Sequence, residues 1–107
     1  MTFSVAGNPV AFRPMRESDR GYIYMTWMRS LQAMTDMPPA RFVAWQKPIV
    51  EWAIDYCDIM VACDPAAPDS IFGWTAQFQG HAGHVLAYTY VMNSLRHHGL
   101  ASELRKQ

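Results

Sequence analysis

The chain has 107 residues, a length that suggests one domain built around one modest hydrophobic core. Half of the residues are hydrophobic and 13% are aromatic, a composition that excludes a disordered or low-complexity protein. The formal net charge is zero, so no global field would attract nucleic acid or an anionic membrane, and we expect neither as a partner.

The sequence also argues against export, membrane insertion and metal binding. No apolar run approaches the roughly 18 residues that a membrane helix needs. Residues 1–14 lack the basic region and apolar core of a signal peptide, so we expect a cytoplasmic protein. Cys57, Cys63 and the four histidines match no common zinc-ligand spacing, so we expect reduced, packed cysteines and no metal site.

The first elements in chain order are a strand and a helix. Residues 10–14 predict a short strand that Pro14 closes. Ser18 or Asp19 can cap the helix that follows. Apolar side chains at helical spacing predict one buried face on this helix, made by Ile23, Trp27, Met28 and Leu31. The proline-rich residues 35–39 end it.

A second helical region is expected from about residue 40 to residue 56. Pro48 should kink or split it, because proline lacks an amide proton and its ring clashes with the preceding turn. The expected buried stripe consists of Phe42, Trp45, Ile49, Trp52 and Tyr56. We expect the tryptophans of this stripe to pack in the core, with a platform for ligand stacking as the alternative.

The hydrophobic period then changes to that of strands. Residues 59–63, 71–79 and 84–92 predict three strands, separated by turns at 64–70 and 80–83. The connections are short, so the strands should form an antiparallel meander. Strict alternation along the third strand would place Val85, Ala87, Thr89 and Val91 on one face and Leu86, Tyr88, Tyr90 and Met92 on the other. The predicted fold class is α+β: an N-terminal strand, two helices, the three-stranded meander and the start of a further helix.

The junction after the third strand has the form Arg96-x-x-Gly99-x-Ala101. A strand leading through a glycine turn into a helix start can bind phosphate, because the first amide groups of a helix have no intrahelical partner. Gly99 lets the backbone approach a ligand, and Arg96 adds positive charge, with His97 or His98 as further donors. The pattern is weak alone, since many helices open after a glycine without a ligand. The paired histidines can equally be read as solvated loop residues.

These residues resemble the GCN5-related N-acetyltransferase (GNAT) family. Its central motif is Arg/Gln-x-x-Gly-x-Gly/Ala after a strand that often contains a Tyr-Val pair, as Tyr90-Val91 does here. Residues 12–30 resemble the family's first strand and helix, and residues 61–77 are similar to a hairpin of short phage-encoded members. The resemblance covers about residues 10–105.

The resemblance implies acetyl-coenzyme A (acetyl-CoA) as the co-substrate and no metal. The loop amides would hold the pyrophosphate, and the edge of the third strand would pair with the pantetheine arm. The cofactor-binding residues that it implies are Val91, Met92, Arg96, His97, His98, Gly99, Leu100 and Ala101. The acetyl group would lie near Tyr88 or Thr89, and the first two helices would border the acceptor site.

The chain also departs from the family pattern. Family members normally continue with a further strand, helix and final strand, and that part carries the tyrosine that protonates the leaving thiolate. Because the sequence ends at Gln107, we expect residues 1–107 to form a single, partial GNAT-like domain, truncated after the pyrophosphate motif. For catalysis the candidate titratable side chains are His84, Tyr88 and Tyr90, with Glu103 also near, and each of them can be read as structural.

Two functions follow as hypotheses. The first is an acyl-CoA-dependent N-acetyltransferase that acts on an amine, such as a lysine of a host protein, and is completed by a second copy. The alternative is a catalytically degenerate GNAT-like scaffold that binds a host protein, in the host cytoplasm if the chain is phage-encoded. A generic α+β domain with neither property is the third reading. In the first two cases we expect a partner or coenzyme A along the open edge of the third strand, which carries Leu86, Tyr88 and Tyr90.

Overall fold

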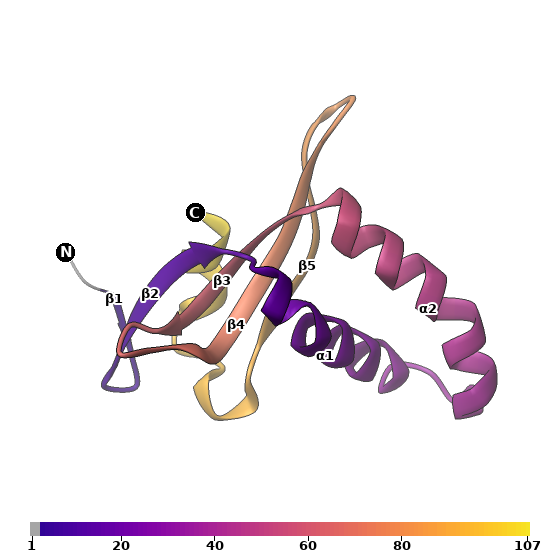
Figure 1. The fold of residues 1–107 in the computed structure, drawn as a ribbon, viewed down its shortest axis with the longest axis horizontal. Helices are drawn as coiled ribbons and strands as arrows, with labels where there is room; N and C mark the ends of the chain where they lie inside the picture. Colours follow the sequence, from indigo (N-terminus) through magenta and orange to yellow (C-terminus); the bar gives the residue numbers. More distant parts are fainter. Residues whose placement is uncertain (1–2) are drawn as a thin grey trace.

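The computed structural model describes residues 3–107 and contains one five-stranded antiparallel sheet in the order β1-β2-β3-β4-β5 (Figure 1). The strands are β1 (Phe3–Val5), β2 (Asn8–Pro14), β3 (Asp58–Asp64), β4 (Ala67–Gly80) and β5 (Gly83–Val91). The helices are α1 (Arg20–Gln32), α2 (Pro39–Tyr56) and α3 (Leu100–Arg105). The predicted α+β class, the meander of the last three strands and the start of a further helix are confirmed.

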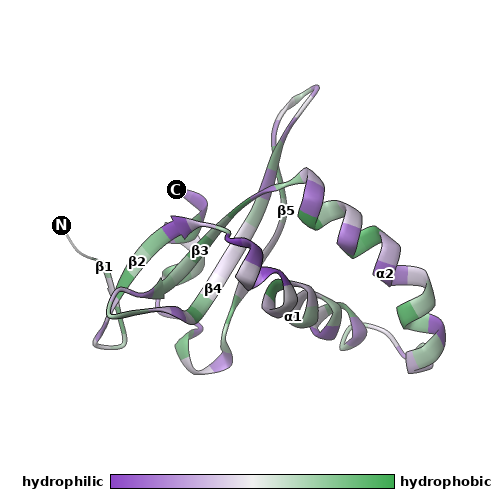
Figure 2. Cartoon of the chain, in the orientation of Figure 1, coloured by the Kyte–Doolittle hydropathy of each residue, from purple (hydrophilic) through white to green (hydrophobic). Residues whose placement is uncertain are grey.

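The sheet separates two hydrophobic layers. On one face lies a core shared by α1, α2, β3 and β4, which includes Ile23, Phe42 and Trp74, and α2 packs mainly against α1. On the other face α3 packs through Leu100 and Leu104. Successive residues of β3 alternate between these layers, as a strand buried on both faces must. Figure 2 shows this as hydrophobic colouring along β2 and β3, whereas the tip of the β4–β5 hairpin is hydrophilic.

The N-terminal strand has a partner that the sequence reading missed. A tight hairpin joins β1 to β2, with Val5 paired to Asn8 across a two-residue turn. Both turn residues have positive φ, 50° at Ala6 and 83° at Gly7, the conformation of the primed turns that match strand twist. The signal in the sequence was the pair Ala6-Gly7 between Val5 and Asn8.

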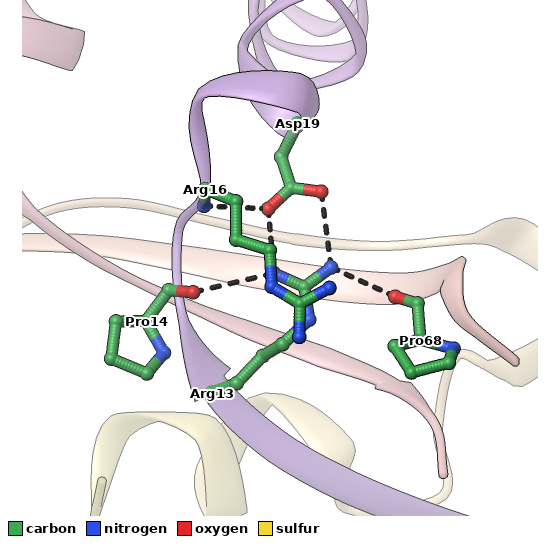
Figure 3. Close-up of polar contacts among 5 residues, drawn as sticks. All are labelled: Arg13, Pro14, Arg16, Asp19 and Pro68. Carbon is green, nitrogen blue, oxygen red and sulfur yellow. Dashed lines mark hydrogen bonds and ion pairs between the residues drawn. The ribbon is translucent and has the colours of Figure 1, made fainter. Parts of the chain in front are cut away.

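A buried ion pair fixes the passage from β2 to α1 (Figure 3). Asp19 occupies the expected capping position of α1, but its carboxylate makes no capping bond into that helix. It accepts instead from the backbone N–H of Arg16 at 2.8 Å and from the guanidinium of Arg13 at 2.6 Å and 3.0 Å. Arg13 also donates to the carbonyl oxygen of Pro68 at 2.8 Å, so one side chain joins β2, the start of α1 and β4.

Helix α2 confirms the predicted second helical region but differs from the sequence prediction in its buried face. It runs without a split through Pro48, which is exposed. The buried face consists of Phe42, Val50, Ala53 and Ile54, so the predicted stripe is wrong except at Phe42. Trp45 and Trp52 are exposed, and the core tryptophans are Trp27 and Trp74.

The predicted turn at residues 64–70 is shorter than expected, because β4 already begins at Ala67.

The strand β5 departs from strict alternation of its side chains between the two faces of the sheet. A register shift lies opposite residue 87, so that Tyr88 pairs with Ala76 but Leu86 pairs with Gln77. Ala87 is therefore the extra residue of a β-bulge. Val85 consequently shares the face of Phe78, Tyr88 and Tyr90, and the predicted placement of Val85 and Leu86 is wrong.

No helix within residues 3–107 is long and apolar enough to cross a membrane. Both cysteines are free, with Cys63 buried in the sheet and Cys57 partly exposed at the end of α2.

Candidate functional site

A pocket of about 490 Å³ lies where β5 leads into α3. Its lining comes from the last part of β5, from the connecting loop and from the first residues of α3. The lining residues are Tyr88, Thr89, Tyr90, Val91, Leu95, Arg96, His97, Gly99, Leu100, Ala101 and Ser102. Most of the side chains expected at a cofactor site from the sequence thus meet at one place.

The connecting loop contains two residues in the left-handed backbone conformation. After a short 3-10 turn at residues 93–95, His97 adopts φ 68° and Gly99 adopts φ 84°. Buried Leu95 and Leu100 anchor the loop on either side. Within the described chain, the backbone N–H groups of residues 97–102 donate to no protein acceptor. A run of unpaired amides beside a pocket can bind an anion.

The side chain of Arg96 is anchored through its Nε atom, and its guanidinium group lies at the pocket. Its Nε donates to the carbonyl oxygen of Val91 at 2.8 Å. The guanidinium carbon lies 5.9 Å from the centre of the Tyr90 ring, a cation–π arrangement. For residues 3–107 no acceptor is found for the two terminal Nη groups. The residue can therefore bind a phosphate oxygen without giving up its present contacts.

The outer edge of β5 presents backbone groups to the same pocket. The N–H of Met92 donates to the carbonyl oxygen of Phe72 at 3.0 Å, so even-numbered residues of this part of β5 bond to β4. The N–H groups of Thr89 and Val91 then point away from β4. No strand in the described part of the chain pairs with this edge.

Aromatic contacts hold the two pocket tyrosines on the α1 side of the sheet. The Tyr88 ring stacks on Trp27 with a centroid distance of 5.7 Å, and the Tyr90 ring stacks on Trp74 at 6.1 Å. Tyr22 of α1 meets the Tyr90 ring edge-on at 6.3 Å. Burial, together with the neighbouring Tyr90 phenol, raises the pKa of Tyr22 to about 12, so Tyr22 stays a neutral hydrogen-bond donor. We did not identify Tyr22 from the sequence, because it lies beside the predicted apolar face.

Four of the predicted or nearby residues do not line this pocket. His84 lies near the hairpin end of β5, hydrogen-bonded to the side chain of Gln77, and lines a separate hollow with Cys57 and Asp58. Met92 and His98 are neighbours of lining residues but are not among them. Glu103 pairs with Lys106 at 3.5 Å. The roles of all the predicted site residues stay predictions.

No cluster of three metal-ligating side chains is present among residues 3–107. Burial, followed by the nearby Asp58 carboxylate, raises the pKa of the Cys57 thiol, so this cysteine is a poor nucleophile near neutral pH.

Comparison with known proteins identifies a similar fold. No protein-family model matches the chain, and no curated protein does. A crystal structure from Desulfovibrio desulfuricans, assigned to the GNAT family of acetyltransferases, superposes with a TM-score of 0.55 and 19% sequence identity. The match covers 91% of this chain and 62% of that one. The chain therefore has a GNAT-like fold and spans about 62% of the length of that structure.

Proposed function

We propose that the chain is an acyl-CoA-dependent N-acetyltransferase, which transfers an acetyl group from acetyl-CoA to an amine. The observation that carries the proposal is the pocket in which the unpaired amides of residues 97–102 and the guanidinium of Arg96 meet the open edge of β5. The GNAT-like fold supports the same assignment. The proposal includes the cytoplasmic location expected from the sequence.

The loop would bind the pyrophosphate of the co-substrate. A pyrophosphate offers several acceptor oxygens with negative charge, and the loop offers consecutive N–H donors with one arginine. Gly99 at the centre of the loop leaves open space within 4 Å of where a Cβ would stand. A side chain there would occupy the approach to the amides.

The edge of β5 would bind the pantetheine arm and the acetyl group. Amide groups of an extended arm can pair with a free strand edge as another strand would. A thioester supplies an activated acetyl carbonyl, whose oxygen gains negative charge as the amine attacks. The outward N–H of Thr89 or Val91 can donate to that oxygen.

The pocket offers few protein groups that could take part in proton transfer. The pocket lining contains no Asp or Glu, and its phenols belong to Tyr88 and Tyr90. We propose that the attacking amine, such as a lysine side chain of another protein, loses its proton to water, or to the oxygen of one of these phenols as that phenol passes its own proton to the leaving thiolate. The leaving thiolate resembles that of cysteine, with a pKa of about 8.5, and can leave without prior protonation.

The second candidate is a GNAT-like scaffold that binds another protein without catalysis. The absence of Asp and Glu from the pocket lining favours it, because no carboxylate is in place to act as a general base. A host protein, and phage origin of the chain, belong to this candidate as proposals that rest on the sequence resemblance.

Calorimetric titration with coenzyme A, combined with an acetyl-CoA turnover assay on amine acceptors read by mass spectrometry, tests the proposal. We expect binding that weakens with added salt, and transfer that is lost in the Arg96→Ala plus Gly99→Val variant. Binding without transfer to any amine would favour the scaffold. A folded chain with no affinity for coenzyme A would overturn the enzyme assignment.

A further inference from the structure

We infer that the chain pairs with a second copy of itself through an exposed aromatic surface on α2. This α2 aromatic surface consists of Trp45, Ile49, Trp52 and Tyr56. It is made of residues other than those that line the pocket at β5, and the inference does not depend on the proposed function.

The four side chains of the α2 aromatic surface are about half exposed, at 52%, 49%, 60% and 52% in chain order. Aromatic contacts order two of these side chains and connect the surface to the sheet. Trp52 stacks on Tyr56 with a centroid distance of 4.8 Å and an interplanar angle of 14°. Tyr56 in turn meets Phe78 of β4 at 5.1 Å, so the apolar surface continues from the helix onto the sheet. Contiguous exposed apolar surface of this kind marks an interaction site.

The available area fits a self-association interface. A large aromatic side chain buries about 150–250 Å² when fully covered, so four half-exposed side chains offer roughly 350 Å² per copy. Two copies would bury about 700 Å² from these side chains alone, and their flanking residues would bring the total toward the roughly 1,000 Å² of a specific interface.

The charges of α2 are arranged for an antiparallel pairing. Its N-terminal half carries Arg41 and Lys47, and its C-terminal half carries Glu51 and Asp55. Two α2 helices related by a twofold axis near Ile49 would place Trp45 against the partner's Trp52. The same axis brings Arg41, at the rim of the surface, near the partner's Asp55, a carboxylate that also pairs with Arg20 of its own chain at 2.7 Å.

The part of β4 and β5 next to the α2 aromatic surface carries no charged side chains, which favours a partner without strong net charge. Residues 70–95, which include the β4–β5 hairpin, contain no Asp, Glu, Lys or Arg. The formal net charge of the chain is also zero, so two copies do not repel each other. The two basic and two acidic residues of α2 also sum to zero, so a partner with a strong net charge would find no opposite net charge here, whereas a second copy matches the surface in hydrophobicity. Figure 1 shows α2 at the outer edge of the fold, away from the sheet along most of its length.

Sedimentation velocity over a dilution series tests the inference. We expect a concentration-dependent species of twice the 12.2 kDa chain mass. Trp45→Ser combined with Trp52→Ser should remove it, because hot-spot aromatics dominate such interfaces. Met34→Ser is the matched control: Met34 is 69% exposed but lies outside the surface, so the dimer should persist.

A charge exchange tests the antiparallel geometry. Arg41→Glu should weaken the dimer by at least about tenfold, since it places two acidic groups together at each end of the interface. Adding Asp55→Arg together with Arg20→Asp to that variant should restore much of the affinity, because the charges are then exchanged both between copies and in the Arg20–Asp55 pair within each chain. Wild-type chain that stays monomeric at high micromolar concentration would overturn the inference. So would a dimer that survives the double tryptophan change, or a monomer that uses these tryptophans only to bind a different protein.

Discussion

Arg13 and Asp19 form a two-point ion pair, with Nη1–Oδ2 at 2.6 Å and Nη2–Oδ1 at 3.0 Å. The side chains are only 12% and 3% exposed, so neither charge has ready access to water. Removal of one partner would leave the other as an uncompensated buried charge. The pair also joins β2 to the start of α1, and α1 in turn supplies Tyr22 and Trp27 to the tyrosines of the pocket.

Asp19→Asn should therefore lower the free energy of unfolding at neutral pH by about 3 kcal/mol. The hydrogen bond from Arg13 lowers the pKa of Asp19 below its usual value of 3.8. A lowered pKa means that the stabilisation is complete above about pH 4 and is lost as the pH falls below that value. Urea unfolding across this range should show the difference between wild type and variant shrinking in acid. Asp55→Asn is the control, because its pair with Arg20 is exposed, and a loss as large as that of Asp19→Asn would contradict the argument.

Gly99→Val should abolish coenzyme A binding while the fold survives. Gly99 has φ 84°, a conformation that a β-branched residue adopts only with strain, and a side chain there would fill open space beside the loop. Gly7→Val is the matched control, since Gly7 has φ 83° and also has open space around it, but lies in the β1–β2 hairpin. Calorimetry should show normal affinity in the Gly7 variant. Equal affinity in wild type and the Gly99 variant would refute the proposed role of the loop.

The strand, loop and helix start around the candidate pocket could be predicted from the sequence because their signals are local. Arg96, Gly99 and Ala101 lie within six residues, directly after a strand with clear β-propensity. The positive φ of Gly99 is what such a glycine usually provides. The two-layer arrangement around β3 likewise follows from its short, continuously apolar run.

The failures have a different cause, since they depend on tertiary context. Helix α2 carries two adjacent apolar faces, and periodicity alone cannot decide which of them turns toward α1 and the core. The face with the smaller residues Val50 and Ala53 is buried, while the larger tryptophans stay outside. The bulge at Ala87 arises from how β5 pairs with β4, so it cannot be predicted from the residue types of β5 alone.

Cys57→Ala and Cys63→Ala should leave coenzyme A binding intact. Neither cysteine lines the pocket, and direct attack by an amine needs no acyl-cysteine. Cys63 is 1% exposed, so its removal should cost roughly 1 kcal/mol of stability through lost packing, and Cys57 should cost less. Thermal unfolding and calorimetry give both quantities. Mass spectrometry that finds an acetyl group on either thiol, released by an added amine, would contradict direct transfer.

Substitutions can distinguish the roles of the candidate catalytic side chains, because these side chains lie at different places. Tyr90→Phe keeps the ring under Arg96 and the Arg96 bond to the Val91 carbonyl, so coenzyme A affinity should not change. If the Tyr90 phenol takes part in proton transfer, as we propose, the rate of acetyl transfer should fall by roughly a hundredfold. His84→Ala should leave the rate unchanged, because His84 lines a different hollow. Tyr22 has a pKa of about 12 and stays protonated at ordinary assay pH, so its ionisation cannot account for the pH dependence. A rate that is unaffected by Tyr90→Phe and Tyr88→Phe and rises with pH up to the pKa of the acceptor amine would show that water accepts the proton.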